Sequence, residues 1–231
     1  MNYIIRIFIV LLLLQHSSLL AKNKIEVNFA ATYNGASLVL PKEAKTPNEI
    51  NSLEITKVRF YISQVQLFKE GKCVLKDPSP GHLIDLSDSG KSKISLISKK
   101  KIDYDAIQFM IGIDSATTYK GIEKGDLDPT NEMYWSWQSG YINFKLEGYS
   151  PFCIKERPKN EFHYHIGGYH FYENTCNEVR LNTTSSNSIR IDLHLEQVLQ
   201  DTLLQEVAHV QLPGTKAASI ATSFAHCFTI H

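Results

Sequence analysis

The sequence has 231 residues, which is enough for one large domain or two small ones with a substantial buried core. Lysine and arginine together number 24, as do aspartate and glutamate, so the formal net charge is zero. This balance argues against nucleic acid as the partner, because binding to phosphates needs a local excess of basic residues.

The N-terminus has the features of a secretory signal peptide. One basic residue, Arg6, precedes an apolar core at residues 7–14, and the segment ends on Ala21. The apolar run is shorter than the roughly 20 residues that a membrane-spanning helix needs, so cleavage near Ala21 is favoured over retention as an anchor. We therefore predict a signal peptide at residues 1–21 and a single exported domain, not membrane-spanning after cleavage, at residues 22–231.

Short runs of alternating apolar residues dominate the rest of the chain and predict half-buried strands. These runs fall at residues 24–29, 57–62, 106–113, 141–146 and 188–195. Clusters rich in Gly, Asn, Asp, Ser and Pro separate them and predict turns. The pattern favours an all-β fold, an antiparallel β-sandwich with a few short helical segments.

Two local departures from simple alternation are visible. Apolar residues occupy even positions up to Ile62 and odd positions from Val65 and Leu67 onward. This shift predicts a β-bulge near residues 63–64. Helical spacing of apolar residues is confined to residues 195–207 and to the C-terminal stretch TKAASIATSFAHCF.

The four cysteines, Cys73, Cys153, Cys176 and Cys227, form an even set, which allows disulfides in an exported chain. Three pairings are open. The pair Cys153–Cys176 is favoured because it closes the shortest loop and encloses a histidine-rich segment. The sequence contains no CxxC motif, so a thiol redox motif or a four-cysteine zinc site has no support.

The acidic stretch before the tryptophans does not match a known ion-binding loop. The segment GDLDPTNE, at residues 125–132, lacks the central glycine and the carboxylate offsets of a calcium loop. We interpret it as a structured loop in which the turn at Asp128 and Pro129 positions the strand that follows. Motifs for hydrolases, metalloproteases and phosphate-binding loops are also missing, so the residues themselves give little support for catalysis.

Both tryptophans of the chain lie two residues apart in MYWSWQSGYINF, at residues 133–144. In an extended strand Trp135 and Trp137 project to the same face. Filling a sandwich core is the usual role of such rings, although polar neighbours and glycine surround these two. The alternative function is a binding or adhesion module in which Trp135, Trp137, Tyr134 and Tyr141 form an aromatic platform for a carbohydrate or a protein.

Histidines gather in the segment FHYHIGGYH, at residues 162–170. His163 and His165 share one face of a predicted strand, and His170 follows a Gly-Gly turn. Two imidazoles side by side suit copper or zinc. Surface histidines without a metal are the competing interpretation, since His serves many other roles.

Four segments, taken in order, resemble the MbnP-like family of exported copper-binding proteins associated with methanobactin. They are VRFYISQVQLF (58–68), FMIGIDSATT (109–118), GDLDPTNEMYWSWQSGYINFKLEG (125–148) and FHYHIGG (162–168). The resemblance implies an all-β, sandwich-like protein without catalytic activity, in the periplasm or at the outer surface. Its implied role is copper acquisition or handling.

The resemblance also implies a ligand set and a partner. In such a protein copper is held by histidine together with a tryptophan that has been oxidised to kynurenine. The oxidant is a partner di-haem enzyme of the MauG/cytochrome c peroxidase type, an MbnH-like protein. In this sequence Trp135 is the first choice for the oxidised residue and Trp137 the second. His165 is the expected imidazole ligand, and His163 is a possible second one. His194 also points outward from its predicted strand, but the sequence does not show whether it lies near these residues.

Overall fold

The computed structural model describes most of the chain after the predicted signal peptide, over residues 23–41, 49–136, 140–155, 158–169 and 174–230. The segment 1–21 and the two side chains Trp137 and His170 lie outside the described residues. No helix within the described ranges combines the length and the hydrophobicity that crossing a membrane requires. The extent of the domain, residues 22–231, stays a prediction.

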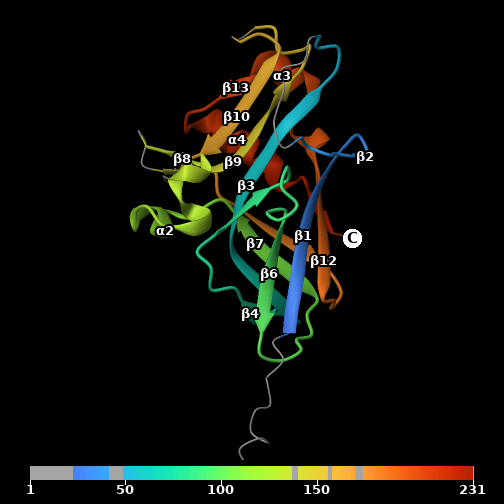
Figure 1. Cartoon of the computed structure of the whole chain (residues 1–231), viewed down its shortest axis with the longest axis vertical. Coiled ribbons are helices and arrows are strands. Elements are labelled where there is room, and N and C mark those ends of the chain that lie inside the picture. Colours follow the sequence, from blue (N-terminus) through green and yellow to red (C-terminus); the bar gives the residue numbers. More distant parts are fainter. Residues whose placement is uncertain (1–22, 42–48, 137–139, 156–157, 170–173, 231) are drawn as a thin grey trace, which may run out of the picture.

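Strands dominate the structure and form two main sheets (Figure 1). The five-stranded sheet has the order β14 (Phe228–Ile230), β12 (Ser188–His194), β1 (Asn23–Tyr33) and β2 (Ala36–Ser37), with β6 (Lys93–Ser98) paired to β1. The nine-stranded sheet has the order β11 (Asn177–Asn182), β7 (Ala106–Ile111), β3 (Glu54–Lys69), β9 (Gly140–Tyr149), β10 (Glu161–Gly167) and β13 (His209–Val210). Three short strands extend it, β4 (Lys72–Lys76) and β5 (His82–Asp85) on β3, and β8 (Tyr134–Trp135) on β9.

The main core lies between the two sheets and is built by the predicted alternation. Strand β1 buries Phe29, and the neighbouring sheet buries Phe60 and Phe109 against it. The Phe29 ring meets those of Phe60 and Phe109 edge to face, with centroids 5.6 and 6.1 Å apart. Helix α4 (Thr215–Ala225) closes the core, since its Phe224 ring stacks on Phe144 at 4.1 Å. Aromatic pairs of this kind add to the stabilisation that burial provides.

The predicted bulge in β3 is confirmed. The register of β3 against β7 shifts between Ser63 and Gln66, and Gln64 has a φ of 52°. The extra residues return the later apolar side chains Val65 and Leu67 to the core, where both are buried.

The sandwich-like, all-β fold is confirmed, but its sheets are mixed rather than purely antiparallel. Strands β1 and β12 run parallel, as do β10 and β13. Apolar alternation specifies which face of a strand is buried and carries no information on the direction of its neighbour. The prediction of an antiparallel sandwich was therefore wrong for these two pairs.

Helices are few and short among the described residues, as predicted. The helical stretch predicted at residues 195–207 is split into a 3₁₀ turn η4 (Leu195–Gln197) and a helix α3 (Asp201–Glu206). The C-terminal helical stretch is confirmed as α4.

The predicted disulfide between Cys153 and Cys176 is wrong, because none of the four cysteines, all of which are described, forms a disulfide. Cys153 is buried in the main core. The Sγ atom of Cys176 instead lies 3.3 Å from the carbonyl oxygen of Ile113 and 3.4 Å from the side-chain amide of Asn143. Burial raises the pKa of the Cys176 thiol to about 12. Short separation in the sequence, on which the predicted pairing of Cys153 with Cys176 was based, is thus not followed by a disulfide in the fold.

A second, smaller apolar cluster covers the opposite face of the nine-stranded sheet. It contains Tyr61, Leu83, Ile113, Leu127, Met133, Trp135, Tyr141 and Ile142. Much of it comes from the segment between β7 and β9, which forms a helix α2 (Ser115–Tyr119), two 3₁₀ turns η1 (Gly125–Leu127) and η2 (Pro129–Asn131), and β8. Figure 1 shows α2 and β8 together on one flank of the molecule. This second cluster holds Trp135 beside the histidine strand.

Candidate metal centre

The two predicted metal-binding histidines lie on β10, whose alternation sorts side chains between the two faces of the sheet. Phe162, Tyr164 and Ile166 are fully buried in the main core. His163 and His165 therefore project from the opposite face, as the sequence predicted, and both side chains are partly buried there. Their ring centroids are 6.1 Å apart.

Neighbouring strands surround the two imidazoles with further donor groups. His163 lies opposite Glu147 of β9 on one side and opposite His209 of β13 on the other. The His163 and His209 rings meet edge to face with centroids 5.1 Å apart. The Glu161 carboxylate, on the same strand, lies 2.9 Å from Nε2 of His163, at hydrogen-bonding distance. The outer face of β9, β10 and β13 is thus rich in imidazole and carboxylate groups.

Three of these side chains are close enough to share one metal ion. Glu147, His163 and His165 each offer a ligand atom, and these atoms lie within 4.8 Å of one another. Imidazole nitrogen with carboxylate oxygen is a donor set that copper and zinc accept. The chemistry of the residues therefore fits the metal that the family resemblance implies.

Trp135 reaches this region through the loop that the sequence identified. The Asp128 side chain accepts a hydrogen bond from the backbone N–H of Thr130 at 2.9 Å and caps η2, which starts at Pro129. Tyr61 donates a hydrogen bond to the carbonyl of Asp126 at 2.9 Å and ties the loop to β3. The predicted role of the Asp-Pro turn, to position the tryptophan strand, is confirmed.

The indole ring of Trp135 is fixed by close packing. Strand β8 pairs Trp135 with Gly140 of β9, and the residue is only 7% exposed. A Cβ atom on Gly167 would lie 2.8 Å from Cζ3 of the indole and 2.5 Å from the carbonyl oxygen of Tyr141. A side chain at Gly167 would therefore force the ring or the backbone to move, because the tryptophan ring and the backbone of β9 occupy the space that it would need.

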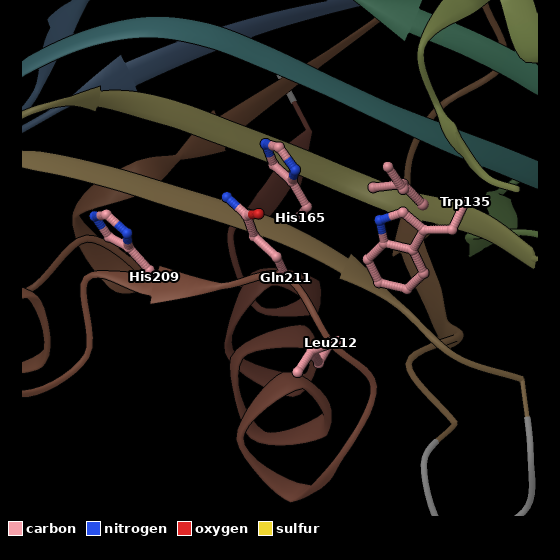
Figure 2. A pocket seen from close by; sticks show the side chains of 6 residues that line it. Trp135, His165, His209, Gln211 and Leu212 are labelled. Carbon is pink, nitrogen blue, oxygen red and sulfur yellow. The ribbon is translucent and has the colours of Figure 1, made fainter. Parts of the chain in front are cut away.

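Trp135 and His165 line one open cavity of about 670 Å³. Its other lining residues are Ile142, His209, Gln211 and Leu212. Figure 2 shows the indole nitrogen of Trp135 on the edge of the ring that faces His165, with Gln211 and His209 further along the cavity. Residues separated by 30 positions in the sequence thus face the same space.

A bulge in β9 shapes one wall of this cavity. Ile166 pairs with Phe144 and Gly167 with Ile142, so Asn143 is an extra residue in β9. The bulge turns Ile142 away from the main core and into the cavity beside Trp135. The buried Asn143 side chain is fully engaged, since it accepts a hydrogen bond from the N–H of Ile113 at 3.0 Å and donates one to Thr175 at 2.8 Å.

The carboxylate of Glu147 is the electrostatic centre of the cluster. Its Oε1 lies 2.7 Å from Nε2 of His165, and its Oε2 lies 3.1 Å from the Lys57 ammonium. Burial alone would raise the pKa of Glu147, but the hydrogen bond from His165 and the charge of Lys57 outweigh it and lower the pKa to about 2.

Burial also acts on the bases around Glu147. It lowers the pKa of His165 from its ordinary value, although the hydrogen bond to Glu147 opposes the shift. It likewise lowers the pKa of Lys145, whose ammonium donates a 2.6 Å hydrogen bond to the carbonyl of Glu132. Burial and the hydrogen bond to Glu147 therefore act on the pKa of His165 in opposite directions, and burial has the larger effect.

The structure brings together three of the predicted residues and separates another. Trp135 and His165 share the cavity, and His163 stands beside His165 in the donor cluster. Trp137 lies outside the described residues. His194 belongs to the other sheet, where its ring nitrogens lie 3.0 Å from the hydroxyl of Thr32 and 2.8 Å from that of Thr229. It is not part of the centre.

Sequence reasoning missed three residues of the site. Glu147 follows the alternation of YINFKLE onto the same face as the histidines, so its outward position was readable, but its partners were not. His209 and Gln211 lie in and next to β13, a strand of two residues that is too short to show a period. Two members of the predicted aromatic platform are buried, since Trp135 and Tyr141 are 7% and 2% exposed. Tyr134 is partly buried, and Trp137 lies outside the described residues.

Comparison with known proteins agrees with this architecture. The structure is similar to that of MbnP from Methylosinus trichosporium, with a TM-score of 0.54 and 13% sequence identity over 84% of this chain and 83% of that chain. At this identity the likeness shows the fold alone. The chain matches no curated protein by sequence. The MbnP family model matches residues 22–216, most of the chain, and the protein therefore belongs to the MbnP family.

Proposed function

We propose that this protein is an exported, non-enzymatic copper-binding protein that acts in methanobactin-associated copper acquisition or handling. The observation that carries the proposal is that Trp135 and His165 line one cavity next to a cluster of Glu147, His163 and His165. Membership of the MbnP family supports the same direction.

The proposed ligands are His165 and Trp135, with His163 as the nearest further imidazole. Intact indole offers only an N–H donor and no lone pair for a metal. Opening of its five-membered ring to kynurenine leaves an arylamine nitrogen and a ketone, which are able to coordinate or to accept hydrogen bonds. We infer that Trp135 is the residue oxidised, by a partner di-haem enzyme of the MauG/cytochrome c peroxidase type, because its indole faces His165 (Figure 2).

The residues of the cavity prepare such a site without the metal. Close packing against Gly167 fixes the plane of the Trp135 ring. Strand β10, which carries both imidazoles, pairs with β9 on one side and with β13 on the other, and this holds the imidazoles in place. Copper would be the cargo of the protein, which would bind it in this cavity and release it again. The chain supplies nitrogen donors from His165 and His163, which suit that metal.

A copper titration with paired histidine variants tests the metal site. Purified protein from the native host is titrated with copper(II), alongside His165→Ala and His163→Ala. Both variants are expected to take up copper more weakly than the unaltered protein. His194→Ala is the matched control, since His194 is also partly buried and hydrogen-bonded but lies on the other sheet. Unchanged uptake by His165→Ala would place the copper elsewhere.

Mass spectrometry of the same native protein tests the oxidation. Conversion of tryptophan to kynurenine exchanges one carbon for one oxygen overall, so the peptide that contains Trp135 gains about 4 Da. Fragment ions between residues 135 and 137 assign the change to one of the two tryptophans. Copper-loaded protein in which Trp135 is an intact indole would contradict the oxidation while leaving the histidine site in place.

A further inference from the structure

Glu147 occupies an unusual position in the donor cluster, because both of its carboxylate oxygens already have partners. Oε2 lies 3.1 Å from the Lys57 ammonium, and Oε1 lies 2.7 Å from Nε2 of His165. Lys57 and Glu147 face each other in the register of β3 and β9. The carboxylate is thus held by a cation on one side and reaches diagonally to an imidazole on the other.

The contact between Glu147 and His165 determines which ring nitrogen carries the proton. An ionised carboxylate has only acceptor sites, so a hydrogen bond at 2.7 Å requires the N–H on the imidazole side. Nε2 of His165 is therefore the protonated nitrogen. In the neutral ring the lone pair is then on Nδ1, and no hydrogen bond engages Nδ1 within the described part of the chain.

The same contact determines which nitrogen is presented to the cavity. The His165 imidazole lines the cavity together with Trp135, while its Nε2 is turned to the carboxylate on β9 (Figure 2). A carboxylate behind a ligating histidine commonly fixes the orientation of the ring and raises its basicity as a ligand. The side chains of His165 and Glu147 are only 18% and 17% exposed, so water competes little for this hydrogen bond.

We propose that Glu147, anchored by Lys57, is a positioning residue that holds His165 in the Nε2–H tautomer and presents Nδ1 as the metal-binding atom. This inference rests on the proposed copper site for its purpose. The tautomer itself is a property of the metal-free protein. The competing assignment is that Glu147 is itself a ligand, since its carboxylate is close enough to share an ion with His163 and His165.

The first experiment measures the tautomer in the metal-free protein, with long-range ¹H–¹⁵N correlation spectra of the histidine rings. The expected result is a pyrrole-type Nε2 and a pyridine-type Nδ1 for His165. In Glu147→Ala the two tautomers of His165 should mix, whereas Glu161→Ala should affect His163 and leave His165 unchanged, because Glu161 contacts His163 instead. An Nδ1–H tautomer in the unaltered protein would overturn the proposal.

The second experiment separates positioning from ligation. Copper(II) is titrated into protein from the native host and into its Glu147→Ala variant, and both are examined by electron paramagnetic resonance. A positioning role predicts copper affinity weakened about 10- to 100-fold with unchanged g and hyperfine values. A changed spectrum would show that the carboxylate is a ligand and would overturn the proposal.

The two experiments also keep this inference apart from the proposed function. Protein that binds no copper at the cavity would refute the proposed function, and the tautomer of His165 in the metal-free protein would still decide the role of Glu147. Lys57→Met provides a second variant if Glu147→Ala does not fold. It leaves the carboxylate in place without its anchor and should also weaken the preference of His165 for the Nε2–H form.

Discussion

The close approach of Gly167 to Trp135 gives a direct test of how the cavity is built. In Gly167→Ala the new methyl group would lie 2.5 Å from the carbonyl oxygen of Tyr141 and 2.8 Å from the indole, where ordinary contact begins at 3.4 Å. The backbone or the ring must therefore move by about 1 Å. Neither is the free end of a flexible side chain.

The expected change in the free energy of unfolding of Gly167→Ala is the difference between two opposing effects. Overpacking of this kind costs about 1–3 kcal/mol. The alanine also restricts the unfolded chain, and this offsets about 0.4–1 kcal/mol, since Gly167 has no positive φ that alanine would strain. We expect the free energy of unfolding to fall by about 1–2 kcal/mol, with the Trp135 ring displaced toward solvent.

Urea unfolding and tryptophan fluorescence measure the two consequences. The variants are made in a Trp137→Phe background and produced without the proposed oxidising partner, so that an intact Trp135 is the sole source of tryptophan emission. Gly167→Ala should lower the urea midpoint and shift the emission to the red. Gly90→Ala is the control, because its methyl group meets only the end of the Asp88 side chain, at 3.2 Å. A Gly167→Ala variant with unchanged stability and emission would refute the packing of Trp135 described above.

Three further predictions concern the cluster, the bulge and the thiols. Because the pKa of Glu147 falls from 4.5 to about 2 on folding, its stabilisation of the metal-free protein is present above pH 4.5 and is lost as the pH falls toward 2. Urea unfolding should show an acid-dependent loss of up to about 3 kcal/mol in this window that is smaller in Glu147→Gln; equal losses would contradict the shift. Asn143→Ala leaves the buried N–H of Ile113 without its acceptor, so the unfolding free energy should fall by about 1–3 kcal/mol, and an unchanged value would contradict the hydrogen bonds of the bulge. Thiol titration of the unfolded chain without reductant should find four reactive thiols. A count of two thiols would show that one disulfide forms and would contradict the structure.

Sequence alternation predicted the strands well because burial of one face is a local property. The runs at residues 24–29, 57–62 and 188–195 all became strands, and even the bulge in β3 was visible as a change of parity at Val65. Strand direction was not visible, since β1 and β12 are far apart in the chain and become parallel neighbours only in the fold. Pairing of this kind depends on the whole topology.

The candidate site was predictable only in part for the same reason. The shared face of His163 and His165 follows from the period of two within one strand. Their surroundings depend on the register between strands, which places Glu147 opposite His163 and brings His209 to its other side. The sequence predicts which side chains leave a strand on the same face. It does not predict which strand lies next to it.

His165 and Trp135 are held in the candidate site by different elements of the fold, so a substitution can displace one without the other. His165 lies on β10, which pairs with β9 on one side and β13 on the other, so its position depends on the sheet. Trp135 lies on a strand of two residues, at the end of a loop held by the Asp128 cap and by the bond from Tyr61 to Asp126. A change in this loop should move the indole while the imidazoles stay in place. The proposed oxidation of Trp135 and the proposed binding of copper by histidine would then respond to different substitutions, although both residues line one cavity.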